Sequence, residues 1–135
     1  MRAAVRTGLL YLLASLCCIL FGAVYELFSH GVYSCFMVYG FLFPLVGGAL
    51  PFFVLAFRGM PPPSGLSRGL HHAGIAALTA GSLFEGALEI YGTTNRLVSV
   101  YWVLGALFVL AGALLYFVCR SQPHATNMEK DDLDL

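Results

Sequence analysis

Four long apolar segments alternate with short polar ones along the chain, at about residues 7–28, 32–57, 71–91 and 97–119. Each is long enough to cross a bilayer, because about 20 helical residues rising about 1.5 Å each span a hydrocarbon core of about 30 Å. The pattern predicts an all-α fold, a polytopic membrane protein whose residues 1–120 form a four-transmembrane-helix bundle. The polar, acidic residues 121–135 have little to bury and predict a disordered tail.

Composition supports this class of protein. Of the 135 residues, 59% are hydrophobic and 10% are charged, and the mean hydropathy is +0.83. These values are too apolar for a soluble domain. The first apolar segment follows Arg2 and Arg6 like a signal peptide, but it is longer than the usual signal core, so we interpret it as a membrane span. No basic patch with interleaved aromatic residues suggests a nucleic-acid partner.

The basic residues predict how the spans are oriented. In a four-span arrangement Arg96 stands alone on one side, and the other six lie together: Arg2, Arg6, Arg58, Arg68, Arg120 and Lys130. Because arginine and lysine accumulate on the cytoplasmic side of membranes, we expect both termini and the tail to be cytoplasmic. The chain is then a multi-pass protein of the plasma membrane, of a bacterial type.

The third segment is rich in small residues and is expected to be the packed centre of the bundle. Gly74, Gly81 and Gly86 allow neighbouring backbones to approach closely. Gly105 and Gly112 predict similar packing of the fourth segment. The same small-residue faces suggest a homo-oligomer or docking on a larger membrane partner, in addition to contact with the lipid bilayer.

The second segment contains residues that disturb a helix, namely Pro44, Gly47, Gly48 and Pro51. A proline inside a helix removes a backbone hydrogen bond, so we expect a kink or a locally opened segment. Such a segment can expose carbonyl groups to a substrate in transporters. The interpretation we prefer is a bend with a close helix contact.

Four ionisable residues near the non-arginine end form the predicted site. Glu85 and Glu89 follow Gly81 at intervals of four, and Glu26 and His30 are also four apart, so each pair is expected to share a helix face. Glu85 lies roughly 9 Å inside the membrane end, where an unpaired charge costs at least about 2.5 kcal/mol. If the two faces meet, they form a cation site or a proton relay. Alternatively, Glu26 and Glu89 are solvated at headgroup level or paired with Arg96, and only Glu85 is buried.

Other chemistry has less support in the sequence. There is no recognisable nucleophile, phosphate-binding loop or metal motif, and we expect no cofactor. His71 and His72 are expected to lie at the membrane interface near Arg68, too far from His30 for a haem held by two histidines. Four cysteines without a C-x-x-C pair are expected to be buried, reduced thiols, at positions 17, 18, 35 and 119.

There is also a weak internal similarity at an offset of 64 residues. Residues 22–24 (GAV) match 86–88 (GAL), and 48–54 (GALPFFV) match 112–118 (GALLYFV). Two spans per repeat would make the two halves parallel, although apolar helices also match by chance.

The phrases YELFSHGVYS (25–34) and LEIYGTTNRL (88–97) resemble stretches of small, uncharacterised four-span bacterial membrane proteins. That resemblance supports the architecture and implies no activity. The size is also similar to that of small multidrug exporters, which carry one membrane glutamate in their first helix. Here the carboxylates are on the first and third segments, and the one-sided arginines argue against dual topology.

From these observations we expect a non-enzymatic membrane protein that binds or conducts a small cation, a proton or a solute through Glu85 and the neighbouring Glu89, Glu26 and His30. The alternative is a structural or accessory subunit of a larger membrane complex, whose glutamates only fix packing. A third possibility is an enzyme acting on lipid headgroups, with Glu26 and His30 as acid and base.

Overall fold

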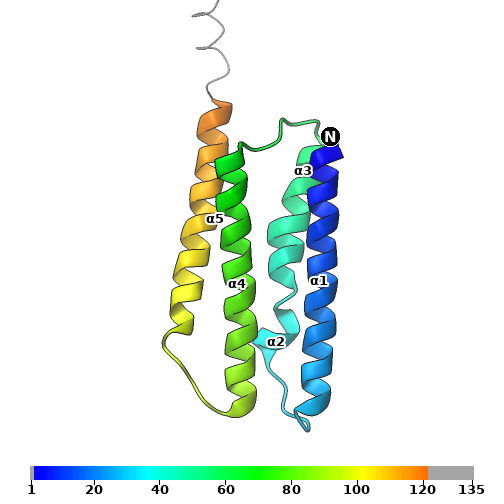
Figure 1. Ribbon diagram of the computed structural model, residues 1–135, viewed down its shortest axis with the longest axis vertical. Coiled ribbons are helices and arrows are strands. Elements are labelled where there is room, and N and C mark those ends of the chain that lie inside the picture. Colours follow the sequence, from blue (N-terminus) through cyan, green and yellow to red (C-terminus); the bar gives the residue numbers. More distant parts are fainter. Residues whose placement is uncertain (1, 122–135) are drawn as a thin grey trace, which may run out of the picture.

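The computed structural model describes residues 2–121, and this part of the chain is helical, with no strand. The elements are α1 (Arg2–Phe28), α2 (Cys35–Tyr39), the π-helix η1 (Phe43–Ala49), α3 (Leu50–Phe57), α4 (Gly65–Tyr91) and α5 (Val98–Arg120) (Figure 1). Four helical stretches are long and apolar enough to cross a membrane, with Cys35–Phe57 counted as one. The predicted all-helical, four-span architecture is confirmed to this extent. The predicted tail, from residue 122 onwards, lies outside the described residues.

Helix α4 is longer than its apolar run. It begins at Gly65 because Ser64 caps it, and the Ser64 hydroxyl accepts a hydrogen bond from the Ser67 amide at 3.3 Å. It ends at Gly92, which has a left-handed φ of 72° that glycine adopts readily. The amides of Gly92 and Thr93 then bond the carbonyls of Glu89 and Leu88 at 3.0 and 2.9 Å.

The second span is interrupted at the segment where its prolines predict a kink or an opening. Helix α2 ends at Tyr39, and the chain then turns into the π-helix η1 before α3 begins. Pro51 has no N–H with which to bond the carbonyl of Gly47 four residues earlier, so regular α-helical bonding cannot pass through this point. A π-turn is one of the ways a helix accommodates such an interruption.

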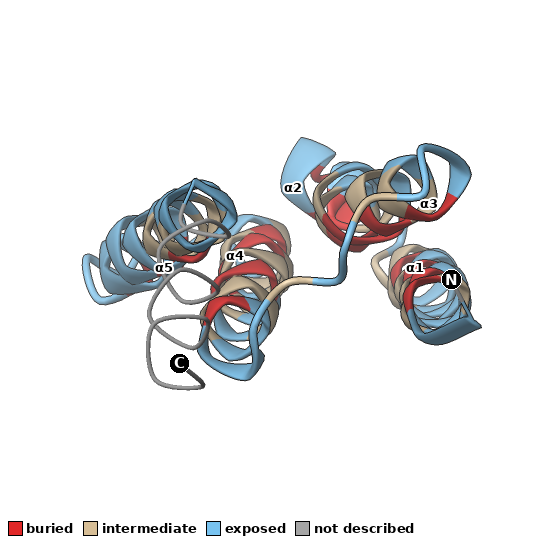
Figure 2. Cartoon of the chain, turned by 90° about the horizontal axis from the view of Figure 1, so that it is seen from above, coloured by how far each residue is buried: buried red, intermediate tan, exposed pale blue. Residues whose placement is uncertain are grey.

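The helices form two hairpins that meet at α4. Helix α1 packs against η1 and α3, and α4 packs against α5 along most of its length. Figure 2, which looks along the helices, shows these two groups side by side. Helix α2 and η1 also contact α4 and so join the hairpins.

Glycines explain why α4 lies at the centre. A Cβ atom on Gly74 would lie 2.7 Å from the Val109 amide nitrogen and 2.8 Å from the Gly105 carbonyl oxygen of α5. On the other side, a Cβ on Gly86 would lie 2.7 Å from the Met37 amide nitrogen of α2. Backbones therefore approach α4 from two directions, which confirms the central position expected from its small residues.

Most large apolar side chains face outwards. Phe57 is 84% exposed, Leu27 81% and Leu13 57%, whereas the buried core is small and centres on Met37 and Phe52. Apolar surface of this extent is unusual on a soluble monomer and is suited to lipid, which indicates a membrane protein. The expectation of buried thiols is wrong for three of the four free cysteines, because Cys17, Cys35 and Cys119 lie on these exposed faces.

Candidate functional site

Charged residues are separated between the two ends of the described molecule. The arginines of α1, α3, α4 and α5 lie at the end where α1 begins, namely Arg2, Arg6, Arg58, Arg68 and Arg120. The three glutamates of the described chain, Glu26, Glu85 and Glu89, lie in the last turns of α1 and α4, towards the opposite end (Figure 1). The predicted carboxylate site is therefore at one end of the bundle, as the order of the spans requires.

Glu89 is held by the start of α2. The hydroxyl of Ser34, the residue before α2, donates a hydrogen bond to Glu89 Oε2 at 2.6 Å. Ser34 is only 1% exposed, so this bond lies in a protected place, although Glu89 as a whole is exposed. The contact fixes the last turn of α4 against the first hairpin.

Glu26 has a carboxylate oxygen without a partner. One turn earlier, a Cβ on Gly22 would lie 3.2 Å from the Met37 carbonyl oxygen, so this face of α1 is turned towards α2. Glu26 Oε1 is buried and has no hydrogen-bond partner among the described residues. Burying a polar oxygen without a hydrogen-bond partner is costly, so this oxygen is a candidate acceptor for a bound ligand.

Glu85 lies on α4 among residues that face two different neighbouring helices. One turn earlier, a Cβ on Gly81 would lie 2.8 Å from Tyr101 Cβ of α5, whereas Gly86 faces α2 and Glu89 reaches Ser34. Positions four apart drift by about 40° around a helix, so Gly81 and Glu89 are turned towards different neighbours. Glu85 itself is partly buried. Gly81, Glu85 and Glu89 therefore do not share one face towards one neighbour: Gly81 faces α5, and Glu89 reaches the start of α2.

The expectation that His30 shares a helix face with Glu26 is wrong. Helix α1 ends at Phe28, and His30 lies in the following turn with a φ of 54° and an exposed side chain. Ser29 stabilises this turn, since its hydroxyl donates to the carbonyls of Glu26 and Val32, both at 2.7 Å. In residues 2–121 no group of three or more His, Cys, Asp or Glu side chains is placed to hold a metal ion.

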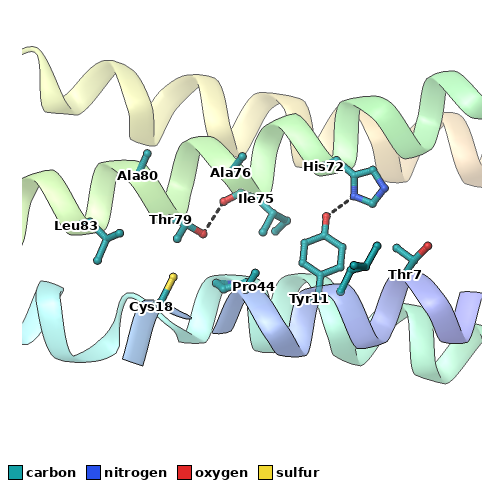
Figure 3. A pocket seen from close by; sticks show the side chains of 12 residues that line it. Thr7, Tyr11, Cys18, Pro44, His72, Ile75, Ala76, Thr79, Ala80 and Leu83 are labelled. Carbon is teal, nitrogen blue, oxygen red and sulfur yellow. Dashed lines mark hydrogen bonds between the residues drawn. The ribbon is translucent and has the colours of Figure 1, made fainter. Parts of the chain in front are cut away.

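A second polar feature, missed in the sequence, joins α1 to α4. The Tyr11 hydroxyl and His72 Nδ1 form a hydrogen bond between the hairpins (Figure 3). The Phe52 ring stacks on both side chains, with centroid distances of 5.9 Å to Tyr11 and 5.6 Å to His72. These residues stand at one end of a cavity of about 600 Å³, which is lined mainly by apolar residues together with Thr7, Cys18 and Thr79.

His71, next to His72, donates a hydrogen bond to a backbone carbonyl group of the second span. His71 Nε2 donates to the Gly47 carbonyl oxygen at 2.7 Å, the carbonyl that Pro51 cannot bond. Both histidines therefore bond groups of the first hairpin, and their expected position at the membrane interface near Arg68 stays a prediction. A proline in an apolar span requires a donor from a neighbouring helix, and this signal was available in the sequence.

The two polar features offer different chemistry. The carboxylate end can take up a positive charge, because Glu26 has an unpaired oxygen and Glu89 keeps a second oxygen beyond its bond to Ser34. The cavity near Tyr11 and His72 is suited to an apolar molecule or an apolar helix, with a few hydroxyl groups along its wall. Comparison of the chain with protein-family models, with curated proteins and with solved structures gives no match.

Proposed function

We propose that this chain is a multi-pass membrane protein that binds, and passes on, a proton at its carboxylate end, with Glu26 as the principal residue. Glu89 and Glu85 are its neighbours in the same end of the bundle. The observation that carries the proposal is the buried Glu26 Oε1 without a hydrogen-bond partner among the described residues. We place the protein in the plasma membrane with the arginine-rich end on the cytoplasmic side, as the distribution of basic residues favours.

A proton fits this geometry better than a metal cation. Divalent hard cations take six or more oxygen ligands, or keep several waters, and no group of three or more candidate side chains gathers within the described range 2–121. A single buried carboxyl group needs only one proton to become neutral. The pairing of Glu26 with His30 as acid and base has no support from their positions, which favours binding over catalysis.

The test measures proton movement in proteoliposomes that contain a pH-sensitive dye. A potassium gradient with valinomycin supplies the driving potential, and the wild type should acidify or alkalinise the interior faster than empty liposomes. We expect Glu26→Gln to lower this rate by at least about tenfold, because the amide cannot take up a proton. Glu85→Gln is the matched control and should retain most of the rate.

Folding has to be checked separately, since Glu26→Gln also changes a buried group. Equal yield and equal thermal stability of the variant would assign the lost flux to the proton site. Proton flux that survives in a folded Glu26→Gln variant would remove the proposal, and loss of flux only in Glu85→Gln would return the principal role to Glu85.

The second candidate function is that of an accessory subunit. It is favoured by the cavity of about 600 Å³ between α1 and α4, which is open and mainly apolar and so is suited to a helix of a partner. Ala76→Trp and Ala80→Trp would fill this cavity. If the protein is a subunit, these changes should release a co-purifying partner, whereas Glu26→Gln should not.

A further inference from the structure

A second groove opens at the arginine-rich end, between α3, α4 and α5. Its volume is about 470 Å³. Three arginines from three different helices line it: Arg58 follows α3, Arg68 is in the second turn of α4, and Arg120 ends α5. All three are exposed at this end of the molecule. Three arginine side chains along one groove make it strongly cationic.

The interior of the groove has a different character from its rim. Leu55, Ala113 and Phe117 are among its lining residues, and they present hydrocarbon. The described lining contains no aspartate or glutamate, and the three glutamates of residues 2–121 all lie towards the opposite end. The arginines therefore have no carboxylate partner from the lining of this groove.

The connector between α3 and α4 gives one of the three guanidinium groups a partner. Arg120 Nη1 donates to Met60 Sδ at 3.4 Å, and a thioether is a weak acceptor. The Tyr116 hydroxyl donates to the Pro61 carbonyl oxygen at 3.3 Å, which holds the connector over the end of α5. Among residues 2–121, Met60 is the one side-chain acceptor bonded by these three arginines.

We propose that this groove binds one anionic phospholipid, with the phosphate at Arg58, Arg68 and Arg120 and an acyl chain along Leu55, Ala113 and Phe117. Guanidinium groups bind phosphate oxygens in pairs and with strong hydrogen bonds. Basic pockets between membrane helices on the cytoplasmic side suit anionic headgroups. This inference goes beyond the proposed proton site, and it rests on the proposed placement of the arginine-rich end on the cytoplasmic side of a membrane.

Two other anions are less suited to the groove. Free phosphate would satisfy the arginines but would leave the apolar interior without an occupant. The acidic residues of the chain itself, Glu129, Asp131, Asp132 and Asp134, have only three apolar neighbours, Met128, Leu133 and Leu135, to fill the apolar interior. A phospholipid matches both parts of the groove, because it joins a phosphate to hydrocarbon.

The experiment uses the full chain in nanodiscs made of phosphatidylcholine, with or without phosphatidylglycerol of the same acyl chains. Native mass spectrometry measures the phosphatidylglycerol that stays bound after release from the disc. We expect retention of one phosphatidylglycerol, and a loss of about fivefold in its binding for each of Arg58→Gln, Arg68→Gln and Arg120→Gln. Arg6→Gln is the matched control, since it is at the same end but does not line the groove.

The apolar part is tested independently. Ala113→Trp fills the groove and should lower phosphatidylglycerol retention, whereas Leu114→Trp, on an exposed face of α5, should leave it unchanged. Thermal stability gives a second measurement. Phosphatidylglycerol should raise the melting temperature of the wild type but not of Arg68→Gln. A role of these arginines restricted to helix capping would lower stability equally in both lipids and would overturn the proposal.

Two further experiments distinguish a phospholipid from two other sources of negative charge, namely free phosphate and the acidic residues of the tail. Inorganic phosphate that displaces phosphatidylglycerol and gives the same stabilisation would assign the groove to a free anion. Neutralising Glu129, Asp131, Asp132 and Asp134 to their amides should not change lipid selectivity. If selectivity for phosphatidylglycerol appeared only after that change, the acidic residues of the tail would be the occupant of the groove in the wild type, and the proposal would be wrong.

Discussion

Gly86 shows how single residues set the distances between the helices of this protein. Its missing Cβ leaves room for the Met37 backbone, which would otherwise lie within 2.7 to 2.9 Å of it. Gly22 of α1 faces the carbonyl of the same residue. Met37 is therefore held between α1 and α4 by two glycines and is only 1% exposed. Gly86 therefore sets how closely α2 approaches α4.

The first prediction concerns that contact. Gly86→Ala should lower the free energy of unfolding by about 1 to 3 kcal/mol, because the backbone of α2 must move away from α4. Gly69→Ala, in the same helix but with nothing within 4 Å of an added Cβ, should instead raise it by up to about 1 kcal/mol. Thermal unfolding in nanodiscs compares the two. A loss of similar size in both variants would contradict the packing described for Gly86.

The hydrogen bond between Tyr11 and His72 gives the second prediction. Tyr11→Phe and His72→Phe each remove one partner while keeping a ring against Phe52. A double-mutant cycle should give a coupling of about 0.6 to 1.7 kcal/mol, the range of interhelical hydrogen bonds in membranes. Unfolding can be followed by fluorescence of the single tryptophan, Trp102, whose ring lies 5.5 Å from Phe43 and 6.0 Å from Phe36. Strictly additive effects would show that the two side chains do not stabilise each other.

At the scale of elements, the opened second span and the start of α4 depend on each other. Pro51 leaves the Gly47 carbonyl without its usual donor, and His71 supplies an N–H from α4 at 2.7 Å. Gly47 also lies close to α4, because a Cβ there would be 2.5 Å from Ile75 Cδ1. The irregular turn η1 is thus stabilised by a helix of the other hairpin.

The third prediction tests this dependence. His71→Leu should destabilise the protein by about 1 to 3 kcal/mol, because the Gly47 carbonyl is left unpaired in an apolar place. In a Pro51→Ala background the same change should cost clearly less, since the alanine amide introduced there can bond Gly47 as in a regular helix. Chemical unfolding of the four proteins measures the difference. An equal cost in both backgrounds would mean that the bond from His71 does not replace the one that proline removes.

The sequence predicts the elements well and the site only in part, and particular residues show why. The apolar runs locate the four spans, Pro44 and Pro51 predict a disturbed second span that contacts a neighbouring helix closely, and Gly92 ends α4 where a glycine is expected. The directions of Glu26, Glu85 and Glu89 depend on which helix lies beside which. The short helix α2 contacts both α1 and α4, and no periodicity in the sequence indicates that. His30 was placed wrongly because the turn at Ser29 ends α1 before it.

At the scale of the whole molecule, the two hairpins use glycine in equivalent ways. A Cβ on Gly48 would lie 2.2 Å from Tyr11 of α1, and one on Gly112 would lie 2.9 Å from the Ser67 carbonyl oxygen of α4. These glycines are equivalent at the offset of 64 residues, and each packs its span onto the first helix of its own hairpin. The hairpins differ in their second spans, since the first has the π-helix η1 between α2 and α3, whereas α5 of the second is one continuous helix.

The separation of charge between the two ends leads to the last prediction, which concerns orientation. Five arginines lie at one end of the described molecule and Arg96 lies in the loop at the other, so the arginine-rich end should be cytoplasmic. In a background with alanine at positions 17, 18, 35 and 119, Thr93→Cys should react with an impermeant maleimide in intact cells. Pro62→Cys, in the connector, should react only after the membrane is opened.

The result of that labelling also fixes the direction of the proposed chemistry. With the predicted orientation, Glu26 faces the exterior half of the membrane and takes its proton from outside, while Arg58, Arg68 and Arg120 meet the anionic lipids of the inner leaflet. The opposite labelling would place the arginine groove on the exterior side, away from the negative surface potential of the cytoplasmic leaflet, and would leave Glu26 to exchange protons with the cytoplasm. The two cysteine variants therefore test the membrane orientation on which both proposals depend. The variants at Glu26 and Arg68 test the proton site and the lipid groove separately.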